Sequence, residues 1–208
     1  MPTDRTTLHR HPERGSFDPA EITALLDEAM ICHVGFMDGG PVVIPSTYAR
    51  IDDRLYLHGS PASRMMKALR SGADVSISVA LLDGLVLESS AFHHSLNYRS
   101  VVVFGKATEI TDPQEKRAVL DAIVEHLIPG RLPHLRPMTD QEVGATAVVS
   151  IPLSEASLKA RSGAPTSVEE WPVWTGVIPT RLTAGPPEPS NPRLAIPAHV
   201  AGFVQRLP

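Results

Sequence analysis

Four polar residues in the middle of the chain have types and spacing suited to binding an anion. They are Ser60, Ser63, Arg64 and Lys67. Their separations of three, one and three positions place them on one side of an α-helix. A helix N-terminus carries about half a positive charge and several N–H groups without intrahelical partners, so hydroxyl, guanidinium and ammonium groups there favour phosphate. The spacing alone fits equally well with a solvated basic face on a surface helix.

The segment around these residues joins a short strand to that helix. Residues 55–57 are apolar and predict a strand, which ends in a turn at 58–60. We expect Ser60 to be the N-cap and Pro61 the first helical residue, because a fixed φ and a missing N–H suit that position. The apolar residues of the segment fall on the opposite side of the helix and predict its buried face: Met65, Met66 and Leu69.

The composition predicts one globular domain in a reducing compartment. A chain of 208 residues is long enough for one sizeable core. It contains no run of about 18 apolar residues, which argues against a membrane span, and its net charge of −4 argues against nucleic acid as the main partner. The single cysteine, Cys32, excludes an intramolecular disulfide, and its apolar neighbours predict a small buried side chain. The polar N-terminus lacks the apolar segment of a secretory signal, so we expect a cytoplasmic protein.

The pattern along the chain predicts a mainly β fold, an antiparallel β-barrel with peripheral helices. Two segments, starting at Asp18 and Asp112, combine a cap, a first-turn proline and a carboxylate three residues after the cap, which predicts a helix at each. About seven strands, mostly joined by hairpins, are expected from the alternating and β-branched runs. Asp83-Gly84 predicts one of the hairpin turns, and residues 131–145 predict a loop.

Prolines mark two further features. Pro45 interrupts a predicted strand and cannot donate to a ladder, so we expect an edge, a bulge or a place where something other than a strand lies alongside. Past Arg181 the prolines crowd together, which divides the chain into a domain at 1–180 and a Pro-rich arm at 181–208. An arm of this kind either wraps around a partner subunit or is disordered.

Five blocks of the sequence, taken in order, carry a family resemblance. They are HPERGSFD, ICHVGF, LYLHGSPASRMMKAL, LLDGLVLESSAFHHSLNYRSVVVFGKA and VWTGVIP, and they span roughly residues 9 to 180. As a set they resemble the flavin-nucleotide-binding branch of the pyridoxamine 5′-phosphate oxidase-like proteins. The resemblance implies an antiparallel split β-barrel that forms a homodimer and binds FMN in two symmetric clefts at the dimer interface.

The resemblance also implies which positions bind FMN. It places residues 43–47 along the isoalloxazine ring, 58–60 beside the ribityl chain and 63–67 at the phosphate. It gives Ser100 the position from which the other subunit reaches the flavin, and Trp174 the position that closes the cleft. The complete implied set is Val43, Ile44, Pro45, Ser46, Thr47, His58, Gly59, Ser60, Ser63, Arg64, Lys67, Tyr98, Arg99, Ser100 and Trp174.

The function implied by the resemblance is that of an FMN-dependent oxidoreductase. FMN would accept electrons from a small-molecule substrate or a donor such as NAD(P)H, and no catalytic residue is assigned. The C-terminal Arg-Leu-His-Asp-Arg segment of true pyridoxamine phosphate oxidases has no counterpart after Trp174, which argues against that activity. Two alternatives stay open: a flavin or haem carrier without turnover, and a nitroimidazole or deazaflavin reductase.

The histidines of the chain do not predict a bound metal ion. His93 and His94 are adjacent, so on a strand they point to opposite faces, and no cysteine or carboxylate stands at a familiar ligand spacing. Some split-barrel relatives bind haem through histidine, so haem is kept as an alternative. We expect His94, Asn97, Tyr98 and Arg99 either to order the loop before a long strand or to line the cleft.

Overall fold

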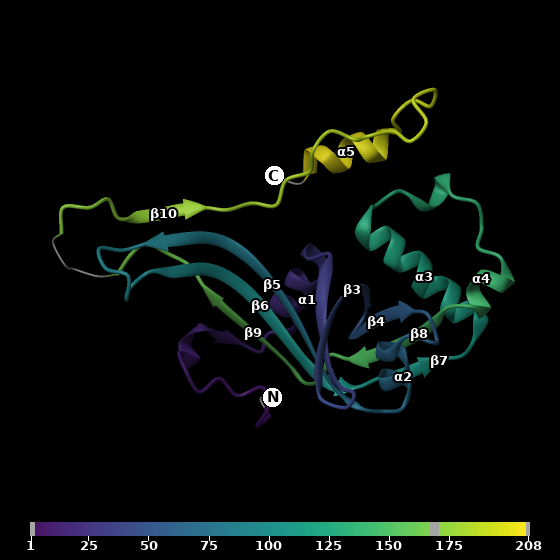
Figure 1. The fold of residues 1–208 in the computed structure, drawn as a ribbon, viewed down its shortest axis with the longest axis horizontal. Helices are drawn as coiled ribbons and strands as arrows, with labels where there is room; N and C mark the ends of the chain where they lie inside the picture. The colour runs from purple at the N-terminus through teal and green to yellow at the C-terminus, as the bar shows by residue number, and fades with distance from the viewer. Residues whose placement is uncertain (1–2, 167–170, 207–208) are drawn as a thin grey trace.

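Ten strands carry the fold and pair into one antiparallel sheet (Figure 1). The computed structural model describes residues 3–166 and 171–206. The strands are β1 (Gly15–Ser16), β2 (Ile31–Met37), β3 (Pro41–Ile51), β4 (Arg54–Gly59), β5 (Asp74–Leu87), β6 (Ser95–Lys106), β7 (Thr108–Ile110), β8 (Ala147–Pro152), β9 (Ala156–Arg161) and β10 (Gly176–Pro179). Their order in the sheet is β1-β9-β6-β5-β2-β3-β4-β8-β7, with β10 added to β5. The predicted mainly β, antiparallel split barrel is confirmed.

Helices lie around the sheet, and their caps explain where two of them begin. They are α1 (Pro19–Glu28), α2 (Arg64–Arg70), α3 (Pro113–Leu127), α4 (Asp140–Gly144) and α5 (Ala198–Arg206), with short 3₁₀ turns η1 (Pro12–Arg14) and η2 (Leu132–His134). The side chain of Asp18 accepts the N–H of Ala20, and that of Asp112 accepts two N–H groups, as the sequence predicts. Within the described ranges, no helix has the length and apolar character needed to cross a bilayer.

One buried tyrosine fixes α1 to the sheet. Tyr48 of β3 has no exposed surface, and its hydroxyl lies 2.6 Å from the carbonyl oxygen of Leu26 and 2.8 Å from that of Ala29. These two carbonyls end α1, where the backbone oxygens lack intrahelical partners. Cys32 is also fully buried in the same core, and burial raises the pKa of its thiol to about 12, so the prediction for this cysteine is confirmed.

The sheet divides at Tyr48. Residues 41–47 of β3 pair with β2, whereas β3 pairs with β4 only from Tyr48 to Ile51. The second edge of residues 41–47 therefore has no strand partner among the described residues. Pro45 lies in this stretch, so its predicted place on an edge is confirmed.

The hairpin predicted at Asp83-Gly84 is wrong. β5 continues through both residues to Leu87, and the register against β6 shifts between Leu82 and Gly84, which makes Asp83 the extra residue of a bulge. The neighbouring strand β10 requires a glycine at position 84, because a Cβ there would lie 3.1 Å from the carbonyl oxygen of Ile178. Gly84 permits the close approach of a neighbouring strand and does not form a turn.

Two other expectations need correction, and a third stays untested. The estimate of about seven strands is too low, because β1, β7 and β9 are short or lack a strong alternating pattern. The predicted loop at 131–145 contains η2 and α4, and α4 starts with a capping box between Thr139 and Glu142 that the sequence displays. The Pro-rich arm at 181–208 stays a prediction: α5 lies within it, and residues 207 and 208 are outside the described ranges.

Removing the Tyr48 hydroxyl tests the link between α1 and the sheet. We expect Tyr48→Phe to lower the free energy of unfolding by about 1 to 3 kcal/mol, because two buried carbonyls lose their shared donor. Urea denaturation followed by circular dichroism measures the change. Tyr56→Phe is the matched control, since the Tyr56 hydroxyl has no hydrogen-bond partner in the described structure, and it should change stability by less than about 0.5 kcal/mol. Equal effects of the two substitutions would contradict this account.

The burial of Cys32 predicts an unreactive thiol. Because the raised pKa keeps the sulfur protonated and the core excludes reagents, we expect no labelling by Ellman's reagent at pH 8 in the folded protein. One thiol per chain should react once urea unfolds the protein. Labelling of the native protein at the rate of a free thiol would show that the core around Cys32 opens readily.

Candidate functional site

The helix with the predicted anion site begins three residues later than expected. Ser63, not Ser60, is the N-cap of α2, and its hydroxyl accepts the N–H of Met66 at 3.2 Å. The hydroxyl of Ser60 accepts the N–H of Ala62 at 3.3 Å in a turn that precedes the helix. This turn redirects the chain after β4 so that α2 buries Met66 completely against the barrel core.

The polar side of α2 faces solvent, as the spacing predicts. Arg64 and Lys67 are exposed, and Arg64 donates from Nε to the carboxylate of Asp38 at 3.0 Å. About half of each side chain in this pair is exposed, so the pair contributes about 0 to 1 kcal/mol. A doubly charged phosphate could therefore displace Asp38 at little cost.

His58, at the end of β4, has an unsatisfied polar atom. Its Nδ1 is buried and has no hydrogen-bond partner among the residues that the structure describes. Burial lowers the pKa of the imidazole, which keeps the ring neutral near pH 7. A buried ring nitrogen without a partner is uncommon, and it suits a position where a bound group supplies the missing hydrogen bond.

Two sets of predicted site residues border the same unpaired edge. Tyr48 and Leu57 form the first pair between β3 and β4, so Thr47 and His58 are the residues at which the strands separate. At the other end of residues 41–47, the Arg64–Asp38 pair joins α2 to the turn between β2 and β3. The expected ring strand at 43–47 and the expected ribityl and phosphate residues at 58–67 are thus brought together within one chain.

The remaining predicted residues lie elsewhere in the sheet. Ser100 belongs to β6 and donates its hydroxyl to the carbonyl of Lys159 at 3.1 Å, and Tyr98 lies on the same face of that strand. In the sheet order, β5 and β2 separate β6 from β3. Trp174 is exposed just before β10. A single chain therefore does not bring Tyr98, Ser100 or Trp174 to the α2 site.

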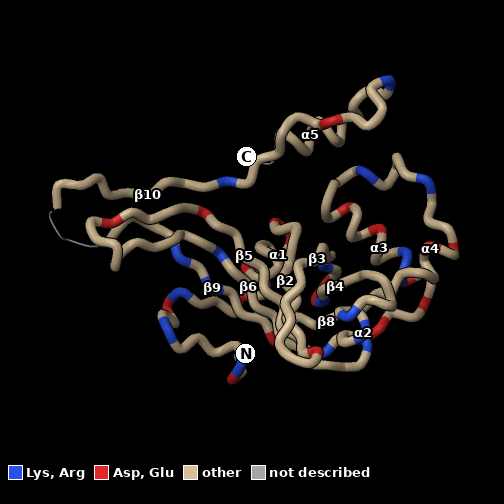
Figure 2. The backbone as a smooth tube through the Cα atoms, viewed as in Figure 1, with Lys and Arg blue, Asp and Glu red and all other residues tan. Residues whose placement is uncertain are grey.

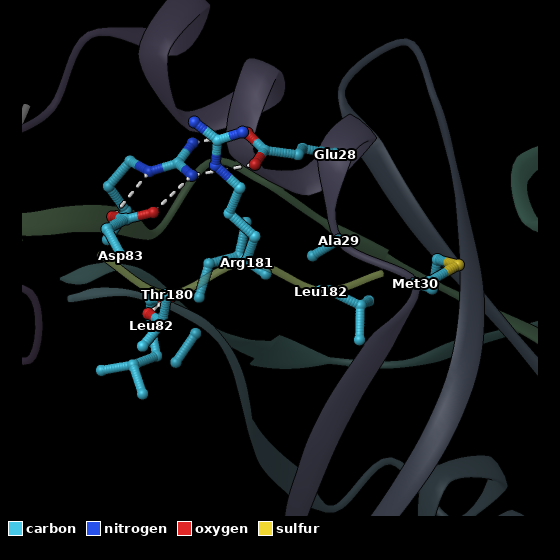
Figure 3. Close-up of a pocket in the computed structure, with 11 residues that line it drawn as sticks. Glu28, Ala29, Met30, Leu82, Asp83, Thr180, Arg181 and Leu182 are labelled. Atoms are coloured by element: carbon cyan, nitrogen blue, oxygen red, sulfur yellow. Dashed lines mark hydrogen bonds and ion pairs between the residues drawn. The ribbon is translucent and has the colours of Figure 1, made fainter. Parts of the chain in front are cut away.

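Arg99 lines a cavity. Its two carboxylate partners, Glu28 and Asp83, are labelled in the close-up of that cavity (Figure 3). Nη2 of Arg99 lies 2.8 Å from a carboxylate oxygen of Asp83 and 2.8 Å from one of Glu28, and the two carboxylates raise its pKa. The cavity measures about 720 Å³ and lies where α1, β5 and the chain after β10 meet. Its lining is Glu28, Ala29, Met30, Ala80, Leu81, Leu82, Asp83, Arg99, Thr180, Arg181 and Leu182. The sequence analysis missed Glu28 and Asp83, because their partner is far away in the chain.

The loop between β5 and β6 is ordered by its own polar groups. Nδ1 of His94 lies 2.8 Å from the carbonyl oxygen of Ser90, and Nδ1 of His93 lies 2.8 Å from the hydroxyl of the same serine. Asn97 donates to the carbonyl of Gly163 at 3.0 Å. Of the two roles predicted for this segment, these contacts match loop ordering. In the part of the chain that the structure describes, no three His, Cys, Asp or Glu side chains are grouped to hold a metal ion.

Comparison with known proteins gives one family and several similar structures. The model of the family described as pyridoxamine 5′-phosphate oxidase matches residues 18–160. The flavocytochrome Anf3 from Azotobacter vinelandii is 41% identical, with a TM-score of 0.90 and 97% of each chain covered. The FAD and haem binding protein from Mycobacterium smegmatis is 34% identical, with a TM-score of 0.84 over 91% of this chain and 96% of that one.

A third structure is similar over a smaller part of the chain. The putative 5-nitroimidazole antibiotic resistance protein from Bacteroides thetaiotaomicron is 28% identical, with a TM-score of 0.59, and the match covers 70% of this chain and 85% of that one. No curated protein matches the chain.

Proposed function

Because the chain belongs to the pyridoxamine 5′-phosphate oxidase family, we propose that it is a flavin-dependent oxidoreductase that also binds haem. Support for two cofactors comes from the flavocytochrome and from the FAD and haem binding protein, which match nearly the whole chain. The proposal that the protein binds a flavin rests on one observation: the unpaired edge of β3 lies beside the cationic turn of α2. Activity on pyridoxamine phosphate is not part of the proposal, because the substrate-binding C-terminal segment has no counterpart here.

The residues near α2 fit a flavin nucleotide. The unpaired backbone of residues 43–47 offers donors and acceptors to the edge of a planar ring, and the orphaned Nδ1 of His58 offers one more polar contact. Ser60, Arg64 and Lys67 would hold the phosphate that FMN and FAD both carry on the ribityl chain. Flavin supplies two-electron transfer, and haem supplies one-electron and oxygen chemistry.

Either flavin satisfies this geometry. The sequence resemblance implies FMN, whereas one similar structure is described as binding FAD. The shared ribityl phosphate is the group that the α2 turn would recognise. Chromatography of the flavin released from the purified protein distinguishes FMN from FAD by retention time. We place the protein in the cytoplasm, where its one thiol would stay reduced.

The proposed site needs a second copy of the chain. Tyr98 and Ser100 of β6 lie away from α2 in one chain, and the resemblance assigns them to the flavin. Large apolar side chains of the β2–β3 sheet face are exposed, including Met37 and Val43. Contact through this face in a homodimer would cover them and deliver the missing residues.

A spectrum and an electron donor test the proposed function directly. The purified protein should show oxidised flavin absorbance, and anaerobic NADH or NADPH should bleach it if either is the donor. A flavin that no donor bleaches would favour a carrier. If the purified protein contains no flavin and binds neither FMN nor FAD when they are added, the proposed function is wrong.

Substitutions on α2 test where the phosphate binds. We expect Arg64→Ala with Lys67→Ala to lose most of the flavin while keeping the fold, because each charge-assisted contact contributes about 1.5 to 3 kcal/mol. Arg70→Ala is the matched control on the same helix, since Arg70 pairs with Glu109 at 2.8 Å, and it should keep its flavin. Asp38→Asn should bind flavin more tightly, because it removes a competing carboxylate. Full flavin occupancy in the double variant would place the phosphate elsewhere.

The oligomeric state tests the need for a second copy. Light scattering of the purified protein should give two chains per particle. Val43→Glu should yield single chains with weakened flavin binding, because a charge would be buried in the contact face. Glu109→Gln on β7 is a surface control that should leave the dimer intact. A monomer with a full complement of flavin would exclude the shared site.

A further inference from the structure

An apolar surface lies at the far end of the β5–β6 hairpin, away from α2 (Figure 1). Leu85 of β5 pairs directly with Leu96 of β6 and, on its other side, with Ile178 of β10. Residues that pair across strands share a face of the sheet, so the three form one row. They are 38%, 46% and 46% exposed, respectively. Figure 2 shows no charged residue on β10.

Trp174 extends this row. A Cβ at Gly176 would lie 2.6 Å from the indole atoms Cη2 and Cζ2, so the ring rests against that glycine. Gly176 and Ile178 are two residues apart on β10 and therefore share a face. The indole, 63% exposed, thus lies on the same face as the row. We refer to Leu85, Leu96, Trp174 and Ile178 as the hairpin platform.

An oriented histidine precedes the platform residue Leu96 in the chain. His94 comes two residues before Leu96, and its Nδ1 lies 2.8 Å from the carbonyl oxygen of Ser90. A carbonyl can only accept a hydrogen bond, so Nδ1 carries a proton, and in the neutral form of such a ring the lone pair is on Nε2. The His94 side chain is exposed. Histidines that bind metals show this arrangement, in which the second nitrogen donates to a carbonyl or carboxylate.

Several other histidines within the described ranges already use their rings in contacts away from the hairpin platform. His126 directs Nε2 at a main-chain carbonyl 2.8 Å away. His134 and His199 stack on each other with ring centroids 4.4 Å apart. His11 is oriented by a carboxylate, but it belongs to the polar N-terminal segment. Unlike these four, His94 combines a ring oriented by a main-chain carbonyl with a place two residues before the platform residue Leu96.

Haem fits this surface better than a bare metal ion does. A bare ion needs several protein ligands, and the described residues contain no such group. Haem iron already has the porphyrin nitrogens and needs only axial ligands from the protein. The flat apolar faces of a porphyrin also suit an uncharged sheet surface that ends in an exposed indole.

We propose that Nε2 of His94 is an axial ligand of the haem and that the porphyrin lies against the hairpin platform. This inference rests on the haem half of the proposed function. The neutral imidazole donates its lone pair to the iron, so one bond forms with no proton released and no electron transferred. A second copy of the chain is the competing occupant of the platform, but it would make no use of the free lone pair.

Haemin titration of the full-length protein tests this assignment. Wild-type protein should bind one haem per chain, followed by the Soret band. Loss of an outer partner of a metal ligand costs about 10 to 100-fold in affinity, so His94→Ala should weaken binding by at least about tenfold and alter the Soret band. His93→Ala is the matched control on the adjacent residue, and it should keep the wild-type spectrum.

A second variant separates lost ligation from a damaged loop. In His94→Gly, added imidazole should restore the wild-type Soret band, because a free ring can fill the ligand position. Leu96→Glu should weaken haemin binding by placing a charge on the hairpin platform, with flavin content unchanged. If wild-type protein binds haem and His94→Ala retains its affinity and spectrum, the ligand assignment is wrong while the proposed function stands. If wild-type protein takes up no haem, both the assignment and the haem half of the function are wrong.

Discussion

The hydrogen bonds of the Tyr48 hydroxyl fix the geometry on which the rest of the molecule depends. They hold the C-terminus of α1 at the point where β3 leaves β4, so the helix and the division of the sheet share one anchor. With α1 held there, Glu28 at its last turn reaches Arg99 of β6, which also binds the bulged Asp83. One buried tyrosine thus positions both the unpaired edge of β3 and a wall of the large cavity.

Local signals predicted much of the fold because the physics behind them is local. The caps at Asp18 and Asp112 and the edge at Pro45 depend on neighbouring backbone groups, and the structure agrees with each prediction. Asp83-Gly84 is different, because the same dipeptide suits a turn or a bulge. The outcome depends on β10, which lies almost a hundred residues later in the chain and needs the space that Gly84 leaves.

In the candidate site, too, neighbouring residues predict some features, whereas contacts between distant elements determine others. Residue types marked the α2 segment, but the choice between Ser60 and Ser63 as cap depends on how Met66 enters the core. The missing partner of His58 and the two carboxylates around Arg99 follow from contacts between distant elements, which no spacing rule reveals. Sequence reasoning therefore predicted which residue types form the candidate site, and the fold shows which groups surround them.

The two prolines of β3 have a consequence for self-association. Pro41 and Pro45 are four residues apart, so the N–H groups that they lack would point to the same side of the strand. Because pairing with β2 is unbroken from Pro41 to Thr47, that side is the open one. An open strand edge with an exposed valine can pair with a strand of another molecule, and such pairing can start aggregation. The two prolines oppose this pairing, because they remove N–H donors that the added strand would need.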